Sequence, residues 1–193
     1  AYVVGSMKIM TRMGKKAFAC DFSLKRVRLS DAIPVLGDNV FEQCRDLEEL
    51  HLPAGLLAMP ARLLWDCTSL KVLEIPRATA SVSERACRFS QLDQLTVHPE
   101  NPALSTDAAC LFSADGSILL SALYELNSYE VPEGCRAVAP DAFKNQAKLR
   151  RITFPCNLVY IGERAFYHSG LMNVQLPEGL QEVGAGAFSR CPM

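Results

Sequence analysis

The sequence predicts a right-handed α/β repeat solenoid, with short parallel strands on a concave face and short helical or irregular segments outside. One sequence motif recurs along the chain. It begins with an apolar residue, which we call the anchor, and has a Leu about six residues later that starts the pattern Leu-x-x-apolar-x-apolar, usually followed by Pro. Within each run of repeats the anchors lie 22 or 23 residues apart, at Phe18, Phe41, Leu64 and Ala86, and again at Phe143, Phe166 and Phe188. A fixed period of this length indicates stacking, because one unit cannot bury its apolar face alone.

The Leu-rich core of each repeat predicts a short strand. In the second repeat, Leu50 and Leu52 alternate with polar residues, so their side chains should point inward, and Pro53 closes the strand where no further donor is needed. A turn follows, and then two apolar residues three positions apart, such as Leu56 and Met59. We expect the next Ala-Phe pair on a short helical turn of the outer face, with the Phe filling the interior.

Two repeats depart from this motif. Residues 1–15 form a degenerate N-terminal segment, and Ser30 replaces the closing Pro of the first clear repeat. In the fourth repeat Ala86 stands where Phe is expected. Phe89, three positions later, is expected to fill the same space.

An irregular island interrupts the repeats over residues 98–131. The fourth and fifth anchors are 57 residues apart, about two and a half periods, so extra chain is inserted here. Asp115 and Gly116 lie between two short apolar runs, which predicts a hairpin before the chain rejoins the solenoid. We interpret residues 1–193 as one solenoid domain. Tyr124 and Tyr129 flank the segment in which the chain returns from this hairpin to the solenoid. We expect them to pack the hairpin onto the solenoid; the alternative is that they contact a ligand.

The spacing of the eight cysteines matches neither a zinc-binding motif nor a disulfide framework. Cys44, Cys67 and Cys191 each lie three residues after an anchor, which indicates a packing position for a small apolar thiol. We expect buried free thiols. The alternative is a disulfide between stacked positions such as Cys44 and Cys67, where parallel Cβ directions give a poor starting geometry.

The aligned repeat, Ala-Phe-x-x-Cys-x-x-Leu-x-x-Ile-x-Leu-Pro-x-x-Leu-x-x-Ile-Gly, resembles the BspA-like class of leucine-rich repeats. The island resembles the same family in four pairs: Asn101-Pro102, Leu111-Phe112, Asp115-Gly116 and Leu119-Leu120. The resemblance implies a leucine-rich-repeat horseshoe and a bacterial cell-surface or secreted protein used in adhesion or partner binding. It supplies no catalytic residues.

Bulk composition excludes some classes of function. The net charge of −1 gives no drive toward nucleic acid, and no apolar run reaches 18 residues, so we expect no membrane insertion. The chain does not begin with a basic segment and an apolar stretch, and we interpret it as a processed or excised piece. A cytoplasmic scaffold is the alternative to a surface protein, and the many thiols would suit it.

Alternate strand positions define two rows of side chains on the expected concave face. They supply the candidate binding residues for a protein or glycan partner: Arg26, Arg28, Glu49, His51, Glu74, Gln94, Thr96, Glu130, Arg151, Thr153, Asn173 and Gln175. Opposite charges on neighbouring strands either neutralise one another or form a mixed-charge groove. Neither row holds an aromatic residue, which counts against a stacking platform for carbohydrate.

No catalytic motif is present, and no cofactor or metal is expected. The chain has no G-x-S-x-G, H-E-x-x-H or glycine-rich phosphate loop. Its histidines, His51, His98 and His168, fall at different positions of separate repeats. The single tryptophan, Trp65, is expected to be partly buried against a neighbouring repeat. The sequence therefore predicts a noncatalytic interaction module.

Overall fold

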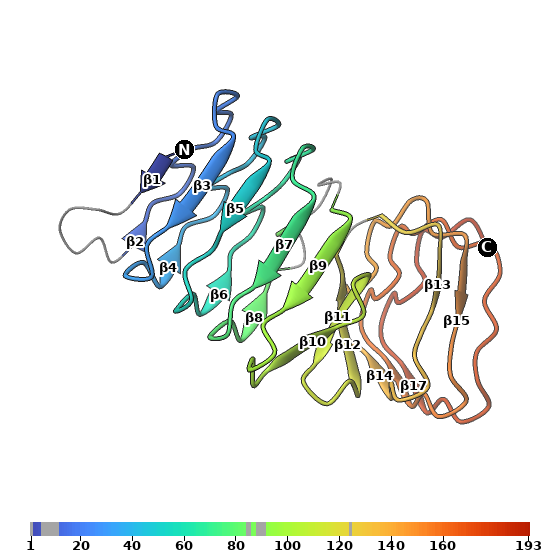
Figure 1. Ribbon diagram of the computed structural model, residues 1–193. Helices are drawn as coiled ribbons and strands as arrows, with labels where there is room; N and C mark the ends of the chain where they lie inside the picture. The colour runs from blue at the N-terminus through green and yellow to red at the C-terminus, as the bar shows by residue number, and fades with distance from the viewer. Residues whose placement is uncertain (1, 5–11, 84–85, 88–91, 124) are drawn as a thin grey trace. The chain divides into compact units, whose positions relative to one another are not determined.

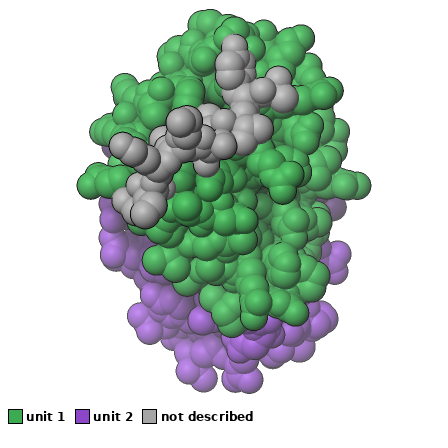
Figure 2. Space-filling model, turned by 60° about the vertical axis from the view of Figure 1, so that its left-hand side comes forward, with its two compact units in different colours: residues 1–108 green, residues 109–193 purple. Residues whose placement is uncertain are grey.

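Stacked short strands build the protein in the computed structural model (Figure 1). It describes residues 2–4, 12–83, 86–87, 92–123 and 125–193. The described residues contain 17 strands and no helix. The chain divides into two compact units, residues 1–108 and residues 109–193 (Figure 2), and each unit is a solenoid whose turns we call rungs.

Two lines of parallel strands run through unit 1. The first line consists of β1 (Tyr2–Val4), β3 (Arg26–Leu29), β5 (Glu49–His51), β7 (Val72–Ile75) and β9 (Gln94–Val97). Within it, β1, β3 and β5 pair in order, as do β7 and β9. The second line consists of two-residue strands that pair as β2 (Arg12–Met13) with β4 (Val35–Leu36) and β6 (Ala58–Met59) with β8 (Ser81–Val82). The strand β10 (Leu104–Thr106) follows β9. The degenerate segment 1–15 thus supplies β1 and β2, which the repeat pattern does not reveal.

Unit 2 begins with the predicted hairpin. Its antiparallel strands are β11 (Cys110–Ser113) and β12 (Ile118–Ala122), and Gly116 takes a φ of 72° in the turn between them. The strand β12 then starts a parallel line with β14 (Ala137–Val138), β16 (Tyr160–Ile161) and β17 (Glu182–Val183). The other line pairs β13 (Ser128–Glu130) with β15 (Arg151–Thr153).

The predicted stacking register is confirmed where strands pair. Leu73 lies opposite Leu95, and the buried side chains alternate with exposed ones along β7 and β9. The predicted interior residues Leu50, Leu73, Leu95 and Ile152 are all buried, and Val174 is partly buried. The curved right-handed horseshoe and the single domain over residues 1–193 stay predictions.

The outer face is made of turns, so the α/β class and the predicted outer helical segments are wrong for the described residues. The residues two before and two after an anchor have left-handed backbone, as at Asn39 (φ 62°) and Gln43 (φ 60°). Between them the anchor N–H points to the next rung, where Phe41 donates to the carbonyl of Leu63 at 3.1 Å. An α-helix needs consecutive residues with right-handed backbone and hydrogen bonds within its own segment. Here the backbone N–H groups of the outer turns donate to the next rung instead, so no helix forms.

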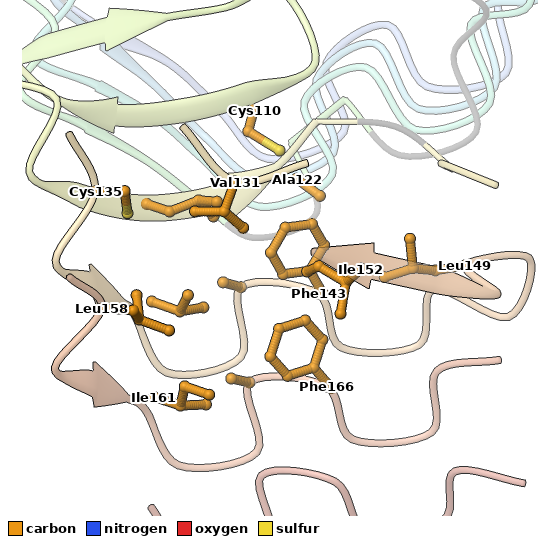
Figure 3. Close-up of a cluster of buried hydrophobic side chains, with 14 of the residues drawn as sticks. Cys110, Ala122, Val131, Cys135, Phe143, Leu149, Ile152, Leu158, Ile161 and Phe166 are labelled. Atoms are coloured by element: carbon orange, nitrogen blue, oxygen red, sulfur yellow. The ribbon is translucent and has the colours of Figure 1, made fainter. Parts of the chain in front are cut away.

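Anchor phenylalanines stack inside each unit, as predicted. Phe18 and Phe41 lie with ring centroids 5.8 Å apart and 7° between their planes. In unit 2, Phe166 lies 5.1 Å from both Phe143 and Phe188 and nearly parallel to each. Figure 3 shows two of these rings one above the other among the buried side chains of unit 2. In the fourth rung Ala86 is buried, and Phe89 lies outside the described residues.

The recurring cysteine position has a hydrogen-bonding reason. Cys44 Sγ donates to the carbonyl of Phe18 at 3.0 Å, and Cys67 Sγ donates to the carbonyl of Phe41 at 3.0 Å. Cys191 makes the equivalent contact in unit 2. The thiol therefore satisfies the anchor carbonyl of the preceding rung while filling a small apolar space.

All eight cysteines are free thiols; five are buried, Cys191 is partly buried and two are exposed. Cys20 lies on an outer turn and Cys156 in the turn after β15, and both are exposed, so the expectation of burial is wrong for these two. Burial raises the pKa of Cys44 to about 11 and that of Cys87 to about 12. The buried thiols are thereby kept in their unreactive protonated form.

A buried asparagine joins the island to unit 1. The side-chain amide of Asn101 donates to the carbonyls of Pro76 at 2.8 Å and Thr79 at 2.9 Å. Its carbonyl oxygen accepts from the backbone N–H groups of Ala103 and Leu104, each at 2.9 Å. The Asn-Pro pair at the start of the island therefore holds the exit of the fourth rung against the third.

Replacing a buried rung residue should destabilise the protein far more than replacing its exposed neighbour. Leu73→Ala removes a side chain that is 1% exposed, and we expect a loss of about 2–5 kcal/mol in the free energy of unfolding. Val72→Ala, on the outward side of the same strand, should change it by less than about 0.5 kcal/mol. Denaturant unfolding of both variants measures the difference, and equal losses would contradict the strand register.

Thiol reactivity should separate the two exposed cysteines from the rest. In the native protein we expect a thiol reagent at neutral pH to modify Cys20 and Cys156 first, since both are exposed and free. In denaturant all eight should react. Peptide mass spectrometry identifies the modified sites. Modification of Cys67 as fast as Cys20 in the native state would contradict the burial of the recurring cysteine position.

Candidate functional site

The twelve predicted binding residues are all exposed. The paired strands confirm their cross-strand register, with Arg26 opposite Glu49, Arg28 opposite His51, Gln94 opposite Val72, Thr96 opposite Glu74, and Thr153 opposite Glu130. Arg151 lies opposite Ser128. Asn173 and Gln175 lie in an extended segment that forms no strand. The two rows therefore exist within each unit, and we call the surface they form the strand face.

Part of the strand face is neutralised by ion pairs. Arg26 Nε lies 3.6 Å from one carboxylate oxygen of Glu49, and His51 Nε2 lies 2.8 Å from the other. The hydrogen bond from His51, with a smaller contribution from the Arg26 charge, lowers the pKa of Glu49 below its usual value. These groups are exposed, so the pairing orients the side chains more than it stabilises the fold. Glu74 has no ion-pair partner among the described residues.

A groove of about 260 Å³ lies at the carboxyl ends of the unit 1 strands, and we call it the unit 1 groove. It is lined by Leu50, His51, Leu52, Ala54, Glu74, Pro76, Arg77, His98 and Glu100. His51 and His98, which belong to separate repeats, both line this groove. Arg77 Nη1 lies 3.2 Å from Glu100 Oε2, and the N–H of Glu100 donates to Nδ1 of His98 at 3.2 Å.

A larger groove of about 860 Å³ lies on the strand face of unit 2, and we call it the unit 2 groove. Four of its lining residues belong to the predicted rows: Arg151, Thr153, Asn173 and Gln175. Apolar side chains, Phe154 and Leu176 among them, line it as well. The Phe154 ring is partly buried and meets Phe166 edge-on at 5.8 Å. The rows alone contain no aromatic residue, so the strand-face prediction missed this one.

The two grooves occupy the same part of the repeat. Each is formed where the last strand residues meet the turn at the closing Pro, which is Pro76 in unit 1 and Pro177 in unit 2. The residues that the rows missed, such as His98 and Glu178, lie in or just before these turns. The position of the closing Pro is the sequence signal that could have located them.

Two of the aromatic candidates outside the strand rows, Trp65 and Tyr129, pack against other side chains. Trp65 is partly buried, as predicted, and the Arg62 guanidinium lies 4.7 Å from its ring centroid. The Tyr129 ring lies 5.8 Å from the Phe143 ring, which supports its packing role. Tyr124 lies outside the described residues.

Metal and membrane features are not seen in the parts of the chain that the structure describes. No group of three or more His, Cys, Asp or Glu side chains is arranged there to hold a metal ion. Those parts also contain no helix with the length and apolar character needed to cross a bilayer.

Comparison with protein families identifies the repeat. The family model of the BspA type leucine-rich repeat region matches residues 6–111 and 116–193, in six copies. A search of curated proteins finds no match.

Solved structures share the fold. The pneumococcal vaccine antigen PcpA is 22% identical with a TM-score of 0.61, over 88% of this chain and 43% of that one. A leucine-rich repeat protein from Eubacterium ventriosum is 16% identical with a TM-score of 0.62, over 90% and 53%. One from Bacteroides ovatus is 17% identical with a TM-score of 0.55, over 90% and 49%. The chain thus spans about half the length of these proteins.

The hydrogen bond between His51 and Glu49 should be visible in the titration of the carboxyl group. His51→Ala should raise the pKa of Glu49 toward its usual value, because the main cause of its lowering is removed. His98→Ala is the control and should leave that pKa unchanged. Folding lowers the pKa of Glu49, so the contact stabilises the folded protein only while the carboxyl group is ionised. Any difference in the free energy of unfolding between the wild type and His51→Ala should therefore be present above about pH 4.3. It should vanish as the pH falls through the folded-state pKa of Glu49. Carboxyl-carbon NMR measures this titration, and an unchanged pKa would contradict the contact.

Proposed function

Because this chain belongs to the BspA-type leucine-rich repeat family, we propose that it is a noncatalytic module that binds a protein or glycan partner through the grooves of its strand face. The observation that best supports this proposal is the recurrence of a groove at the same repeat position in both units. Each groove combines exposed polar side chains with an apolar lining, the arrangement typical of binding sites. Binding of nucleic acid and insertion into a membrane form no part of the proposal.

The unit 2 groove offers the stronger chemistry for recognition. Arg151 has no carboxylate partner among the described residues, so its guanidinium is available to an acceptor on a partner. Asn173 and Gln175 add amide donors and acceptors on the same side of the groove. Phe154 and Leu176 supply apolar contact area beside them. Such a surface suits an extended segment with hydroxyl, amide or carboxylate groups, as in a glycan or an exposed loop.

The unit 1 groove differs in charge at the same repeat position. The carboxylate of Glu74 faces it without an ion-pair partner among the described residues, while Arg77 and Glu100 neutralise each other. Its histidines, His51 and His98, add groups that donate or accept hydrogen bonds. A partner that presents a basic side chain would complement Glu74. The two grooves therefore suit different parts of one ligand or different ligands.

A bacterial cell-surface or secreted, adhesin-like protein is the setting we favour. The family resemblance supports this setting, and one protein of similar fold is a pneumococcal vaccine antigen. A cytoplasmic scaffold with the same binding role is the second candidate, and the eight free thiols favour it. Labelling of intact cells with an antibody against this chain distinguishes the two, since a cytoplasmic protein is labelled only after permeabilisation.

Reversing the charge of Arg151 should weaken partner binding without unfolding the protein. A glycan array and a panel of extracellular-matrix proteins would first identify a bound partner of the wild type. Arg151→Glu should then lower the affinity at least about 10-fold, as expected when a hydrogen bond to a charged group is lost. Arg136→Glu is the matched control, because Arg136 is exposed, lies outside the groove and undergoes the same change of charge. Glu74→Lys makes the corresponding test in unit 1.

The proposal fails if every partner found by these screens binds Arg151→Glu, Glu74→Lys and the control with equal affinity. Circular dichroism and thermal unfolding confirm that each variant is folded. Both substituted residues are exposed, so their unfolding temperatures should stay close to that of the wild type.

A further inference from the structure

A separate pocket of about 340 Å³ lies on the outer side of unit 2. Three basic residues line it, namely Arg150, His168 and Arg190, together with small residues that include Ala147, Ser169 and Gly170. Neither Asp nor Glu is among its lining residues, and it shares no lining residue with the unit 2 groove. Its lining therefore holds basic groups and no acidic group.

The repeat geometry brings the three basic side chains together. His168 and Arg190 each lie two residues after an anchor phenylalanine, on stacked rungs, with left-handed backbone at φ 55° and 60°. The N–H of His168 donates to the carbonyl of Ser189 at 2.9 Å, which holds these two turns in register. Arg150 comes from the preceding rung, so three segments of chain meet at one pocket.

A glycine lets two rungs approach each other closely beside this pocket. A Cβ at Gly170 would lie 2.2 Å from the carbonyl oxygen of Ala147, so a larger residue cannot occupy this position without moving the backbone. Leu171 also follows its anchor Phe166 by five residues where the other complete repeats have six. The small residues Ala147, Ser169 and Gly170 line the pocket between the basic residues.

Neutral groups hold the two arginines in place. Arg150 Nη1 donates to the carbonyl of Gly170 at 3.2 Å, and the Arg190 guanidinium lies 5.5 Å from the ring centroid of Tyr167. Neither has an ion-pair partner among the described residues. Among the described residues, five other arginines do meet carboxylates: Arg26, Arg45, Arg62, Arg77 and Arg164.

The histidine is oriented in the same way. His168 Nδ1 donates to Oδ1 of Asn145 at 3.1 Å, so Nε2 is a donor toward an anion only when the imidazole is protonated. A guanidinium has five N–H donors, and the contacts described above use only part of them. The pocket thus presents two positioned guanidiniums whose charge no carboxylate of the described residues neutralises, and a protonated imidazole would add a third donor.

We propose that this pocket binds a tetrahedral oxyanion, a sulfate or phosphate group. Two guanidiniums and, when it is protonated, an imidazole approach from three segments, and three donor groups match an anion with three or more oxygen acceptors better than a planar carboxylate with two. The group comes either from the free ion or from a sulfated or phosphorylated sugar. This inference goes beyond the proposed function, because it concerns a second site away from the grooves.

NMR titration of the full chain with sodium sulfate and sodium phosphate tests the proposal, with sodium chloride at equal ionic strength as the reference. We expect saturable shifts for residues around the pocket with sulfate and phosphate only. Arg150→Gln and Arg190→Gln should each weaken binding about 10-fold, as expected for loss of a hydrogen bond to a charged group. Arg190→Lys should recover part of the affinity through its charge.

Arg164→Gln is the matched control. Arg164 lies on an outer turn of the same unit, but its guanidinium already lies 3.1 Å from a carboxylate oxygen of Glu163. Its replacement should change the affinity for sulfate by less than about twofold. The proposal is overturned if chloride produces the same shifts, or if Arg164→Gln weakens binding as much as Arg190→Gln does.

Two further ligands distinguish the sources of the oxyanion. Glucose 6-sulfate and glucose 6-phosphate should bind more tightly than the inorganic ions if a sugar carries the group, and no more tightly if the site takes the free ion. Either result supports an oxyanion site when both arginine variants weaken it. Arg151→Glu should retain sulfate binding, so a failure of the groove proposal and a failure of this one give different results.

Discussion

Backbone hydrogen bonding from rung to rung is the constraint on which the rest of this structure depends. On the outer turns the anchor N–H donates to the next rung, as from Phe41 to Leu63 in unit 1 and from Phe143 to Ala165 in unit 2. Each rung must place its backbone N–H groups opposite the carbonyls of the equivalent turn in the next rung. The repeat length is therefore held near 22 or 23 residues. The anchor rings then stack, and a thiol such as Cys67 reaches the carbonyl of the preceding anchor.

The same constraint separates what must repeat from what is free to vary. Inward positions face their equivalents on neighbouring rungs, so residues such as Leu73 and Leu95 stay apolar. Outward positions carry no such requirement, and a groove at one repeat position holds Glu74 and His98 in unit 1 but Arg151 and Asn173 in unit 2. A rigid interior thus supports surfaces of different chemistry at equivalent places.

The apolar period predicts the Leu-rich strands from β3 onward and their register because it reports burial directly, whereas the Asp-Gly pair predicts the hairpin. The apolar period could not predict the outer turns, since the left-handed positions are occupied by residues such as Lys16 and Arg62, which give no glycine signal. A short amphipathic stretch around an anchor therefore looks like a helical turn in the sequence. Only part of the candidate site could be predicted, because strand alternation identifies outward strand residues and not turn residues. Arg151 and Gln175 follow this alternation, whereas His98 and Glu100 line their groove from a turn.

Left-handed backbone at residues other than glycine costs about 1–2 kcal/mol each, and here the inter-rung hydrogen bonds offset it. The cost arises from the backbone and Cβ, so it depends little on the rest of the side chain. Consequently the position two residues after each anchor accepts Asn145, His168 and Arg190 on successive rungs of unit 2. These side chains form a column on the outer turns, partly buried at Asn145 and exposed at His168 and Arg190, whose composition is as free as that of the strand face. A solenoid of this kind therefore has a second variable surface on its outer turns, built by the same ladder that excludes helices there.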